Sequence, residues 1–305
     1  MSPSRSGIAY GFGAYALWGL FPLYIKLLDE IGSAEILAHR VVWSLVIVLA
    51  LLVIGRNLRR LRTLGRRAYG LLALAAVLIC INWGVYIWAV NSDQIVETSL
   101  GYFINPLVTV LLGVVVFGER LRRLQWVAMG LAAIAVIILT VDYGRPPWIA
   151  LALAFSFGTY GLVKKKAAVD AVESLAVETA VLFLPALTYL VVLQADGSAA
   201  FAEAGWGDTL LLIGCGIVTA TPLLLFGAAA VRIPLTTLGT LQYLTPSLQF
   251  LLGVAVYGEQ VPPVRWVGFA LIWLALIVLT AEVLVRRQRR NAVSRRVLET
   301  TSAPR

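Results

Sequence analysis

Apolar residues fill the chain in long runs that short polar segments separate. A run of about 20 apolar residues is long enough for an α-helix to cross a hydrocarbon core of about 30 Å. Backbone N–H and C=O groups in lipid must find partners within their own segment, so each run is predicted to be a helix. We predict ten membrane-spanning helices at residues 8–28, 34–54, 70–90, 97–117, 124–141, 148–164, 173–194, 208–230, 237–257 and 264–285.

The stretch at residues 100–140 occurs a second time at residues 240–280, without a gap. Matched residues lie 140 positions apart: Pro106 with Pro246, Gly113 with Gly253, Glu119 with Glu259, and Trp126 with Trp266. Such self-similarity predicts an internal duplication. Because each step covers five predicted helices, an odd number, the second copy crosses the membrane in the opposite sense.

The predicted fold class is therefore an all-α polytopic membrane protein with ten transmembrane helices in two inverted five-helix repeats. We place the repeats at residues 7–141 and 147–285, and a basic cytoplasmic tail at 286–305. Inverted repeats are typical of transporters that expose one site to either side of the membrane in turn. The duplication thus favours transport by alternating access.

Composition and charge support a membrane location. Hydrophobic residues make up 60% of the chain and charged residues only 13%, against about a quarter charged in an average soluble domain. Lys and Arg concentrate in every second predicted loop, which puts those loops and both termini in the cytoplasm. The net charge of +9 then reflects topology. The expected partners are the lipid bilayer and a small-molecule substrate, with no nucleic acid and an open oligomeric state.

Several chemistries are not indicated. Cys80 and Cys215 each lie inside an apolar run, which predicts buried thiols and neither a disulfide nor a metal site. The sequence has no P-loop, no H-E-x-x-H and no G-x-S-x-G motif. We therefore expect no enzyme, no catalytic residue and no cofactor. Transport would be secondary, with proton or Na⁺ coupling as the alternatives.

Three ionisable residues inside predicted spans are candidates for binding, since such residues are costly in a bilayer. Arg40 and Glu178 lie at equivalent places in the two repeats, near opposite membrane surfaces. Arg40 would meet an anionic group, and Glu178 a cation or a proton; alternatively, each snorkels to the interface or has a local partner. A separation of roughly 12 Å along the membrane normal argues against a direct ion pair. His39, the only histidine, is either a proton relay or a hydrogen-bonded packing residue.

Neutral polar residues inside the spans form a second group of candidates. Asn82 and Tyr86 are four positions apart and share one helix face. The others flank the two repeat prolines: Tyr102, Asn105, Gln242 and Tyr243. Pro106, Pro222 and Pro246 each remove one helical hydrogen bond and are predicted helix breaks at mid-membrane, as in transporter sites, or else plain kinks packed on a neighbour.

Several short stretches in order resemble one family. They are Glu35–Arg40 (EILAHR), Trp88–Asn91 (WAVN), Ser99–Pro106 (SLGYFINP), Gly118–Arg120 (GER), and Ala154–Phe157 (AFSF) with Tyr160–Leu162 (YGL). Together they resemble the RarD family of EamA-domain permeases, in the drug/metabolite transporter superfamily, over about residues 7–285. The resemblance implies two inverted five-helix halves, cytoplasmic termini and a bacterial inner membrane. Many EamA halves carry Trp-Gly in their first helix, whereas this second half has Phe157-Gly158.

The resulting hypothesis is a secondary transporter, a permease or exporter, of a small polar metabolite, an amino-acid-like solute or a drug. Relatives across the superfamily move such solutes or nucleotide sugars, so the resemblance does not choose among them. The alternatives are an intramembrane enzyme or a channel acting on a lipid-like or small solute. An activated nucleophile or metal set would favour the enzyme, and long rows of like polar residues would favour the channel.

Overall fold

A computed structural model describes residues 5–56, 58–118, 121, 123–230, 232–233 and 241–281. Throughout these residues the regular structure is helical. They contain eight helices that are long and apolar enough to cross a membrane, and two shorter apolar helices, Trp148–Lys164 and Leu244–Val256. The chain is thus an all-helical, multi-pass membrane protein. The predicted basic tail at 286–305 and the end of the last predicted span lie outside the described residues.

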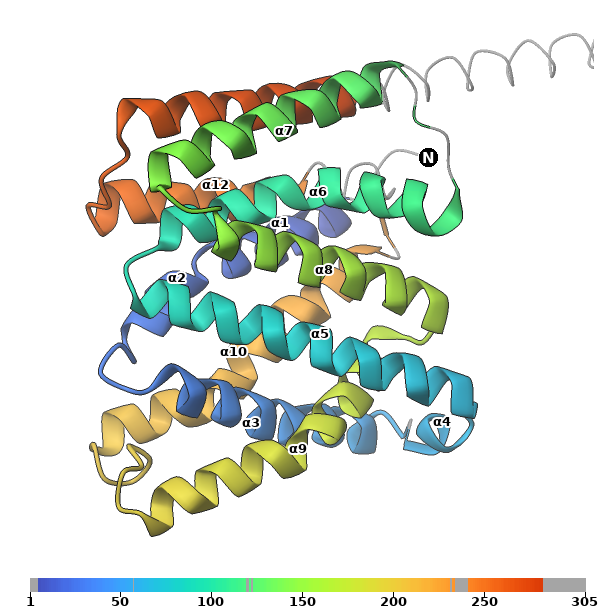
Figure 1. The fold of residues 1–305 in the computed structure, drawn as a ribbon. Coiled ribbons are helices and arrows are strands. Elements are labelled where there is room, and N and C mark those ends of the chain that lie inside the picture. Colours follow the sequence, from blue (N-terminus) through green and yellow to red (C-terminus); the bar gives the residue numbers. More distant parts are fainter. Residues whose placement is uncertain are drawn as a thin grey trace, which may run out of the picture. The chain divides into compact units, whose positions relative to one another are not determined.

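The helices, most of which are labelled in Figure 1, follow the apolar runs of the sequence closely. Their bounds are α1 Arg5–Gly19, α2 Phe21–Lys26, α3 Ser33–Ile54, α4 Leu58–Arg62, α5 Arg66–Asn91, α6 Ile95–Phe117, α7 Arg123–Tyr143, α8 Trp148–Ala167, α9 Ala171–Ala195, α10 Trp206–Ala230 and α12 Leu244–Leu251. A π-helical turn, η1 Leu252–Val256, continues α12, and a further helix runs from Pro263 to Ala281.

The first predicted span is interrupted. Arg5–Lys26 is one candidate span by length and composition, but within it α1 ends at Gly19 and α2 begins at Phe21. Pro22 lies in the first turn of α2, where a proline's missing N–H group costs no helical hydrogen bond. The chain therefore restarts its helix at this point.

The predicted helix breaks need correction. Pro106 lies inside α6 and Pro222 inside α10, and both helices continue through the proline. At Pro246 the interruption lies just upstream, because Gln242 and Tyr243 form a turn and α12 begins at Leu244. Pro246 is thus in a first helical turn, the position that tolerates proline best.

The chain forms two compact units, and each draws on both predicted repeats. One unit takes residues up to 105 and from 148 to 260, and the other takes 106–147 and those from 261 onward. In the second unit, Arg265 Nε donates to Asp142 Oδ2 at 2.6 Å. Its guanidinium also lies 4.1 Å from the ring centre of Tyr143. All polar site candidates fall in the first unit.

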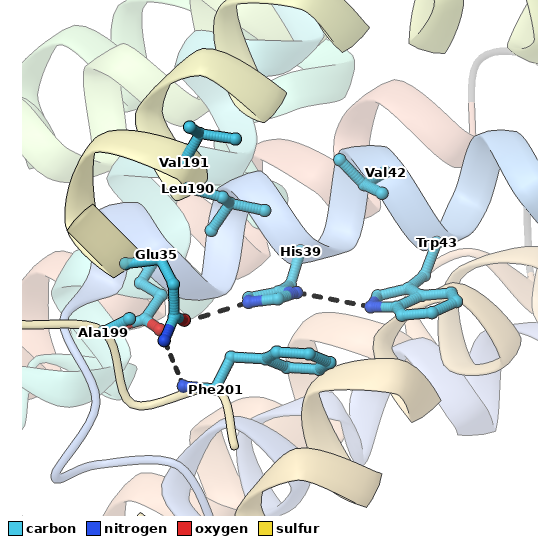
Figure 2. Close-up of a pocket in the computed structure, with 9 residues that line it drawn as sticks. Glu35, His39, Val42, Trp43, Leu190, Val191, Ala199 and Phe201 are labelled. Carbon is cyan, nitrogen blue, oxygen red and sulfur yellow. Dashed lines mark hydrogen bonds and ion pairs between the residues drawn. The ribbon is translucent and has the colours of Figure 1, made fainter. Parts of the chain in front are cut away.

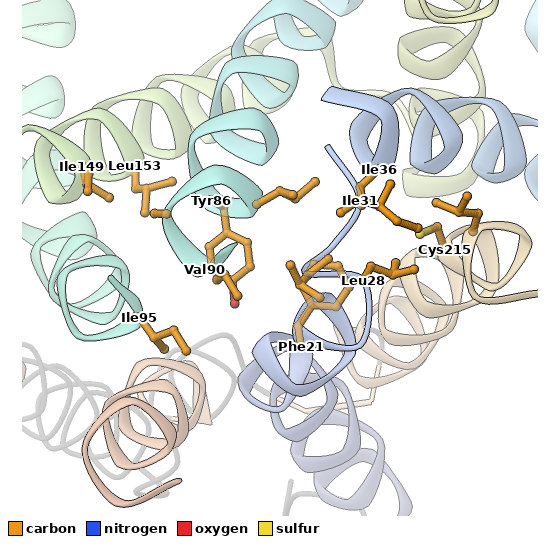
Figure 3. Packing of buried hydrophobic residues seen from close by; sticks show 14 residues of the cluster. Phe21, Leu28, Ile31, Ile36, Tyr86, Val90, Ile95, Ile149, Leu153 and Cys215 are labelled. Carbon is orange, nitrogen blue, oxygen red and sulfur yellow. The ribbon is translucent and has the colours of Figure 1, made fainter. Parts of the chain in front are cut away.

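A buried apolar cluster forms the core of the first unit (Figure 3). It joins Phe21 of α2, Ile36 of α3, Tyr86 of α5, Leu153 of α8 and Cys215 of α10. Removing apolar side chains from water stabilises a fold by about 25 cal/mol per Å². Lipid tails are as apolar as these side chains, so in a bilayer the cluster is stabilised mainly by close packing. The cluster fixes the helices that carry Arg40 and Asn82.

Three glutamates hold segments of the first unit together by accepting hydrogen bonds from backbone N–H groups. The pairs are Glu35 with Ala200 (2.9 Å) and Phe201 (3.2 Å), Glu97 with Ile149 (3.2 Å), and Glu259 with Ile95 (2.6 Å) and Val96 (2.9 Å). The N–H groups of Ile95, Val96 and Ile149 belong to first turns of helices, which lack helical acceptors. Burial raises the pKa of Glu259 above its ordinary value, although the two N–H groups lower it.

Candidate functional site

Arg40 is a buried cation in the middle of the first unit. Its side chain belongs to α3 and the residue is 6% exposed. The guanidinium carbon lies 4.0 Å from the ring centre of Trp83 and 4.6 Å from that of Phe21, both within cation–π range. Nε donates to Thr219 Oγ1 at 3.0 Å. Among the residues that the structure describes, no carboxylate lies within ion-pair distance of Arg40.

Gly216 brings α10 close enough to α3 for this hydrogen bond. A Cβ atom at Gly216 would lie 2.6 Å from the carbonyl group of Trp43. One turn later on α10, the hydroxyl of Thr219 donates to the Cys215 carbonyl at 2.8 Å. The Thr219 oxygen therefore offers its lone pairs to Arg40.

A network of amides and phenols adjoins the guanidinium. Asn82 Nδ2 donates to Leu153 O at 3.1 Å and to Ser156 Oγ at 3.0 Å, and Asn82 Oδ1 accepts from the Tyr102 hydroxyl at 3.3 Å. The ring of Tyr102 lies 6.0 Å from that of Tyr86. The structure therefore brings Asn82, Tyr86 and Tyr102 together.

Gln249 extends this network from the second repeat. Its Nε2 donates to the Tyr86 hydroxyl at 3.1 Å and to Trp18 O at 3.2 Å. Gln249 is 2% exposed, and its Oε1 has no hydrogen-bond partner among the described residues. The amide thus leaves one buried acceptor beside the Tyr86 hydroxyl.

A row of aromatic rings leads from Arg40 toward Glu178. Successive centroids are 5.8 to 6.1 Å apart, in the order Phe21, Tyr86, Tyr102, Phe157 and Tyr160. These separations are typical of aromatic pairs in contact. Phe157 of α8 is a member of this row.

Glu178 is satisfied by its neighbours on α8 and α9. Its Oε1 accepts from Lys164 Nζ at 2.8 Å and from Ser174 Oγ at 2.6 Å, and its Oε2 accepts from the Tyr160 hydroxyl at 3.0 Å. The carboxylate is 1% exposed. The structure thus gives Glu178 the local partner that one interpretation of the sequence predicted, and no ion pair joins it to Arg40.

His39 lies apart from this cluster, on another face of α3. Its Nδ1 accepts from Trp43 Nε1 at 3.3 Å, and its ring stacks on Phe201 at 4.8 Å. It lines a pocket between α3, α9 and the loop after α9 (Figure 2). The other three candidates occur on their expected elements: Asn105 is buried on α6, and Gln242 and Tyr243 are partly buried in the turn before α12. None of the contacts above involves these three.

Sequence reasoning missed the direct partners of both charged candidates. Tyr160 and Lys164 are four positions apart on α8, and Ser174 and Glu178 are four apart on α9. Helical spacing could therefore have found each pair. The contact between the two helices, and the contact of Arg40 with Thr219, depend on tertiary packing. In the part of the chain that the structure describes, no three His, Cys, Asp or Glu side chains gather as metal ligands would.

Comparisons with known proteins agree with this architecture. The model of the EamA-like transporter family matches the chain twice, at residues 5–141 and 146–281. Protein RarD of Streptomyces exfoliatus is 57% identical over 290 residues, covering 94% of this chain and 92% of that protein. An uncharacterized transporter of Vibrio cholerae is 44% identical over 281 residues, covering 92% and 93%.

A solved structure is similar in fold. It matches with a TM-score of 0.59 at 20% identity, and the match covers 93% of this chain and 100% of the solved chain. At that identity the likeness concerns the fold alone. With the family match over both halves, and with relatives named as transporters, the chain belongs to the EamA-like transporter family of the drug/metabolite transporter superfamily, alongside the RarD proteins.

Proposed function

We propose that the protein is a secondary transporter of the bacterial inner membrane. It moves a small polar metabolite, an amino-acid-like solute or a drug by alternating access between two inverted five-helix halves, with both termini in the cytoplasm. The family, the multi-pass fold and the names of the relatives support this proposal. The observation that carries it is the buried charge of Arg40, which has no ion-pair partner among the residues that the structure describes.

A charged side chain inside a membrane-spanning helix is costly unless another group compensates it. The guanidinium of Arg40 contacts the rings of Phe21 and Trp83 and the hydroxyl of Thr219. Cation–π contacts are worth about 0.5–2 kcal/mol each, which offsets only part of the cost of removing a guanidinium from water. An anionic group of a solute would supply the missing compensation. Guanidinium also suits carboxylate and phosphate geometrically, because it can donate two parallel hydrogen bonds.

The surrounding groups suit a polar solute. Asn82, Tyr86 and Tyr102 offer amide and phenol groups beside the cation, and Asn105, Gln242 and Tyr243 are proposed to contribute in other states of the cycle. A few polar groups in apolar surroundings are the usual composition of a small-molecule site. The aromatic row then provides apolar contact between Arg40 and the Lys164–Glu178 pair.

Glu178 is the proposed coupling group, for protons in preference to Na⁺. A proton on this carboxylate would end its ion pair with Lys164, which lies 2.8 Å away. Glu178→Gln keeps the size of the side chain and removes the titration. We expect transport by this variant in proteoliposomes to lose its dependence on a pH gradient while the protein still folds. Unchanged dependence on the gradient would remove Glu178 from the coupling mechanism.

Binding tests the proposal directly. Purified protein is screened for thermal stabilisation by amino acids, nucleosides and antibiotics at two pH values, because a ligand that binds only the folded state stabilises it by mass action. A solute that stabilises the wild type is expected to have no effect on Arg40→Ala. Arg59→Ala, which removes an exposed arginine of α4, is the matched control and should keep the full shift. Equal shifts in both variants would contradict a site at Arg40.

A further inference from the structure

The pocket at His39 is separate from the Arg40 cluster and has its own composition (Figure 2). Its volume is about 200 Å³, and its lining comes from α3, from the end of α9 and from the loop that follows α9. The polar groups are Glu35, His39 and Gln194, and the rest of the lining is apolar or aromatic: Val42, Trp43, Leu190, Val191, Ala199 and Phe201. A few polar groups within a mostly apolar lining are typical of a small-molecule site.

One nitrogen of the His39 imidazole has no hydrogen-bond partner in the part of the chain that the structure describes. Trp43 Nε1–H can only donate, so Nδ1 of His39, 3.3 Å away, must be the acceptor. The ring proton is therefore on Nε2. This nitrogen is buried and has no hydrogen-bond partner among the described residues. The nearest carboxylate oxygen, Oε1 of Glu35, is 4.0 Å away, which is beyond hydrogen-bond distance.

The two groups that face this gap select a hydroxyl. Nε2–H needs an acceptor, whereas the Glu35 carboxylate accepts hydrogen bonds and repels anions. A hydroxyl oxygen can accept from Nε2–H and donate its own proton to Glu35. Two bonds of about 2.8 Å reach Nε2 and Oε1 across 4.0 Å if the oxygen lies to one side of the line between them. Oε1 already accepts from the N–H groups of Ala200 and Phe201, so the hydroxyl would be its third donor. A carboxylate would be repelled, an ammonium group cannot accept, and a carbonyl group cannot donate.

The remainder of the pocket suits the apolar part of such a ligand. Water occupies about 30 Å³ per molecule, so a single bridging water would leave most of the 200 Å³ unfilled against apolar walls. Val191 lines the pocket and is 59% exposed. An exposed side chain on a spanning helix would be within reach of lipid, and we take this side of the pocket, between α3 and α9, as its entrance.

We infer that this pocket binds a hydroxyl-bearing amphiphile, an alcohol or phenol, whose oxygen bridges His39 Nε2 and Glu35. The ligand enters from the side of the helix bundle and places its apolar part against Val42, Leu190 and Phe201. The same chemistry is available from a free small molecule or from a lipid whose headgroup carries hydroxyls. This site does not depend on Arg40 or on what the protein transports.

The single histidine makes a direct test possible. Because the chain has one histidine, ¹⁵N-histidine labelling gives imidazole signals from this pocket alone in solid-state NMR of the protein in phosphatidylcholine bilayers. We expect Nε2 to carry the proton. Titration with 4-ethylphenol should shift its signal saturably, and ethylbenzene, which has the same shape without the hydroxyl, should leave it unchanged. A proton on Nδ1, a shift that never saturates, or equal shifts from both compounds would overturn the inference.

Bilayer composition distinguishes the two sources of the ligand. If the lipid is the natural occupant, bilayers with phosphatidylglycerol, which has free glycerol hydroxyls, should shift the Nε2 signal without any phenol. If a small molecule is the occupant, only the phenol should shift it. An Nε2 signal that neither the phenol nor the lipid changes indicates a bridging water only, and it overturns the proposal.

Two matched variants locate the binding. Val42→Phe fills the pocket, and Val46→Phe makes the same change one helical turn away, at an exposed position outside the lining. Half-saturation by 4-ethylphenol should require at least about tenfold more ligand in Val42→Phe and be unchanged in Val46→Phe. Equal titrations in the two variants would contradict binding in this pocket. Both variants retain His39, so the same signal is read in each.

Discussion

Arg40 and Glu178 lie at equivalent places in the predicted repeats, yet their surroundings are opposite. Glu178 has a lysine, a serine and a tyrosine on its two oxygens. Arg40 has aromatic faces and one threonine hydroxyl, with no described carboxylate in reach. Glu178 is compensated within the protein, whereas the described residues offer Arg40 no charged partner. Of the two charged residues, Arg40 is therefore more directly available to a ligand.

The largest effect on stability is expected at Glu178, because both of its carboxylate oxygens have hydrogen-bond partners. Glu178→Ala leaves Lys164 without its carboxylate, and breaking a buried pair in this way costs about 3–5 kcal/mol. Lys164 is 22% exposed, so we expect a loss of about 2–3 kcal/mol. Unfolding of the purified variant in detergent measures the change.

The double variant Lys164→Met, Glu178→Met provides the control for that loss. It removes both charges together, so it should be less destabilised than Glu178→Ala, because paired apolar residues often replace a buried ion pair without great loss. A cost below about 0.5 kcal/mol for Glu178→Ala, which is typical of exposed ion pairs, would contradict compensation of Glu178 by Lys164.

The approach of α10 to α3 gives the next effect. Gly216→Ala places a Cβ atom 2.6 Å from the Trp43 carbonyl, so the helices must separate, at a cost of about 1–3 kcal/mol. Gly227→Ala is the matched control on the same helix, because its Cβ would meet no atom within 4 Å. That control should gain up to about 1 kcal/mol from higher helix propensity. Equal stabilities of the two variants would contradict the close approach.

Arg40 itself should have a small effect on folding. Arg40→Met removes an uncompensated charge and keeps much of the side-chain volume. We expect the unfolding free energy to change by no more than about 1 kcal/mol, the scale of the lost cation–π contacts. Solute-induced stabilisation should be absent in the same variant. A destabilisation as large as that of Glu178→Ala would indicate that Arg40 is mainly structural.

The smallest effect on stability is expected at Glu259. Its environment is intermediate between those of Arg40 and Glu178, because its hydrogen-bond partners are backbone N–H groups and not a charged side chain. Its pKa is raised in the folded state, first because of burial, so the folded protein holds this proton more tightly than the unfolded chain. The contribution of this proton to the free energy of unfolding is therefore present at low pH, and it is lost as pH rises from about 4.5 through the raised pKa of Glu259. Relative to Glu259→Gln, the wild type should therefore lose stability as pH rises through that window. A difference that stays constant with pH would contradict the raised pKa.

Much of the fold follows from the sequence because apolar length determines which segments cross a membrane. The bounds of α3, α5 and α9 differ from the predicted spans by a few residues at most. Proline chemistry was less decisive. α6 stays helical through Pro106, whereas Pro22 lies at the start of α2, next to a break that the apolar pattern did not predict.

The site was predictable in its members but not in its contacts. Arg40 and Glu178 could be identified from the sequence because a charged side chain inside a membrane span is energetically costly and therefore rare. Whether that charge is compensated depends on which helices are adjacent. Trp83 and Thr219 contact Arg40 from α5 and α10, and neither residue is unusual in a membrane helix by itself. That information is in the packing and not in the local pattern.

The three glutamates that accept backbone N–H groups have a consequence for motion. Five amides, those of Ile95, Val96, Ile149, Ala200 and Phe201, are tied to Glu35, Glu97 and Glu259. By the predicted topology, all of these lie on the side away from the cytoplasm. Hydrogen bonds to charged acceptors are stronger than neutral ones, so separation of these segments must break several strong bonds together. Their amide protons should exchange with deuterium as slowly as those inside helices, and this side of the unit should open as one cooperative step.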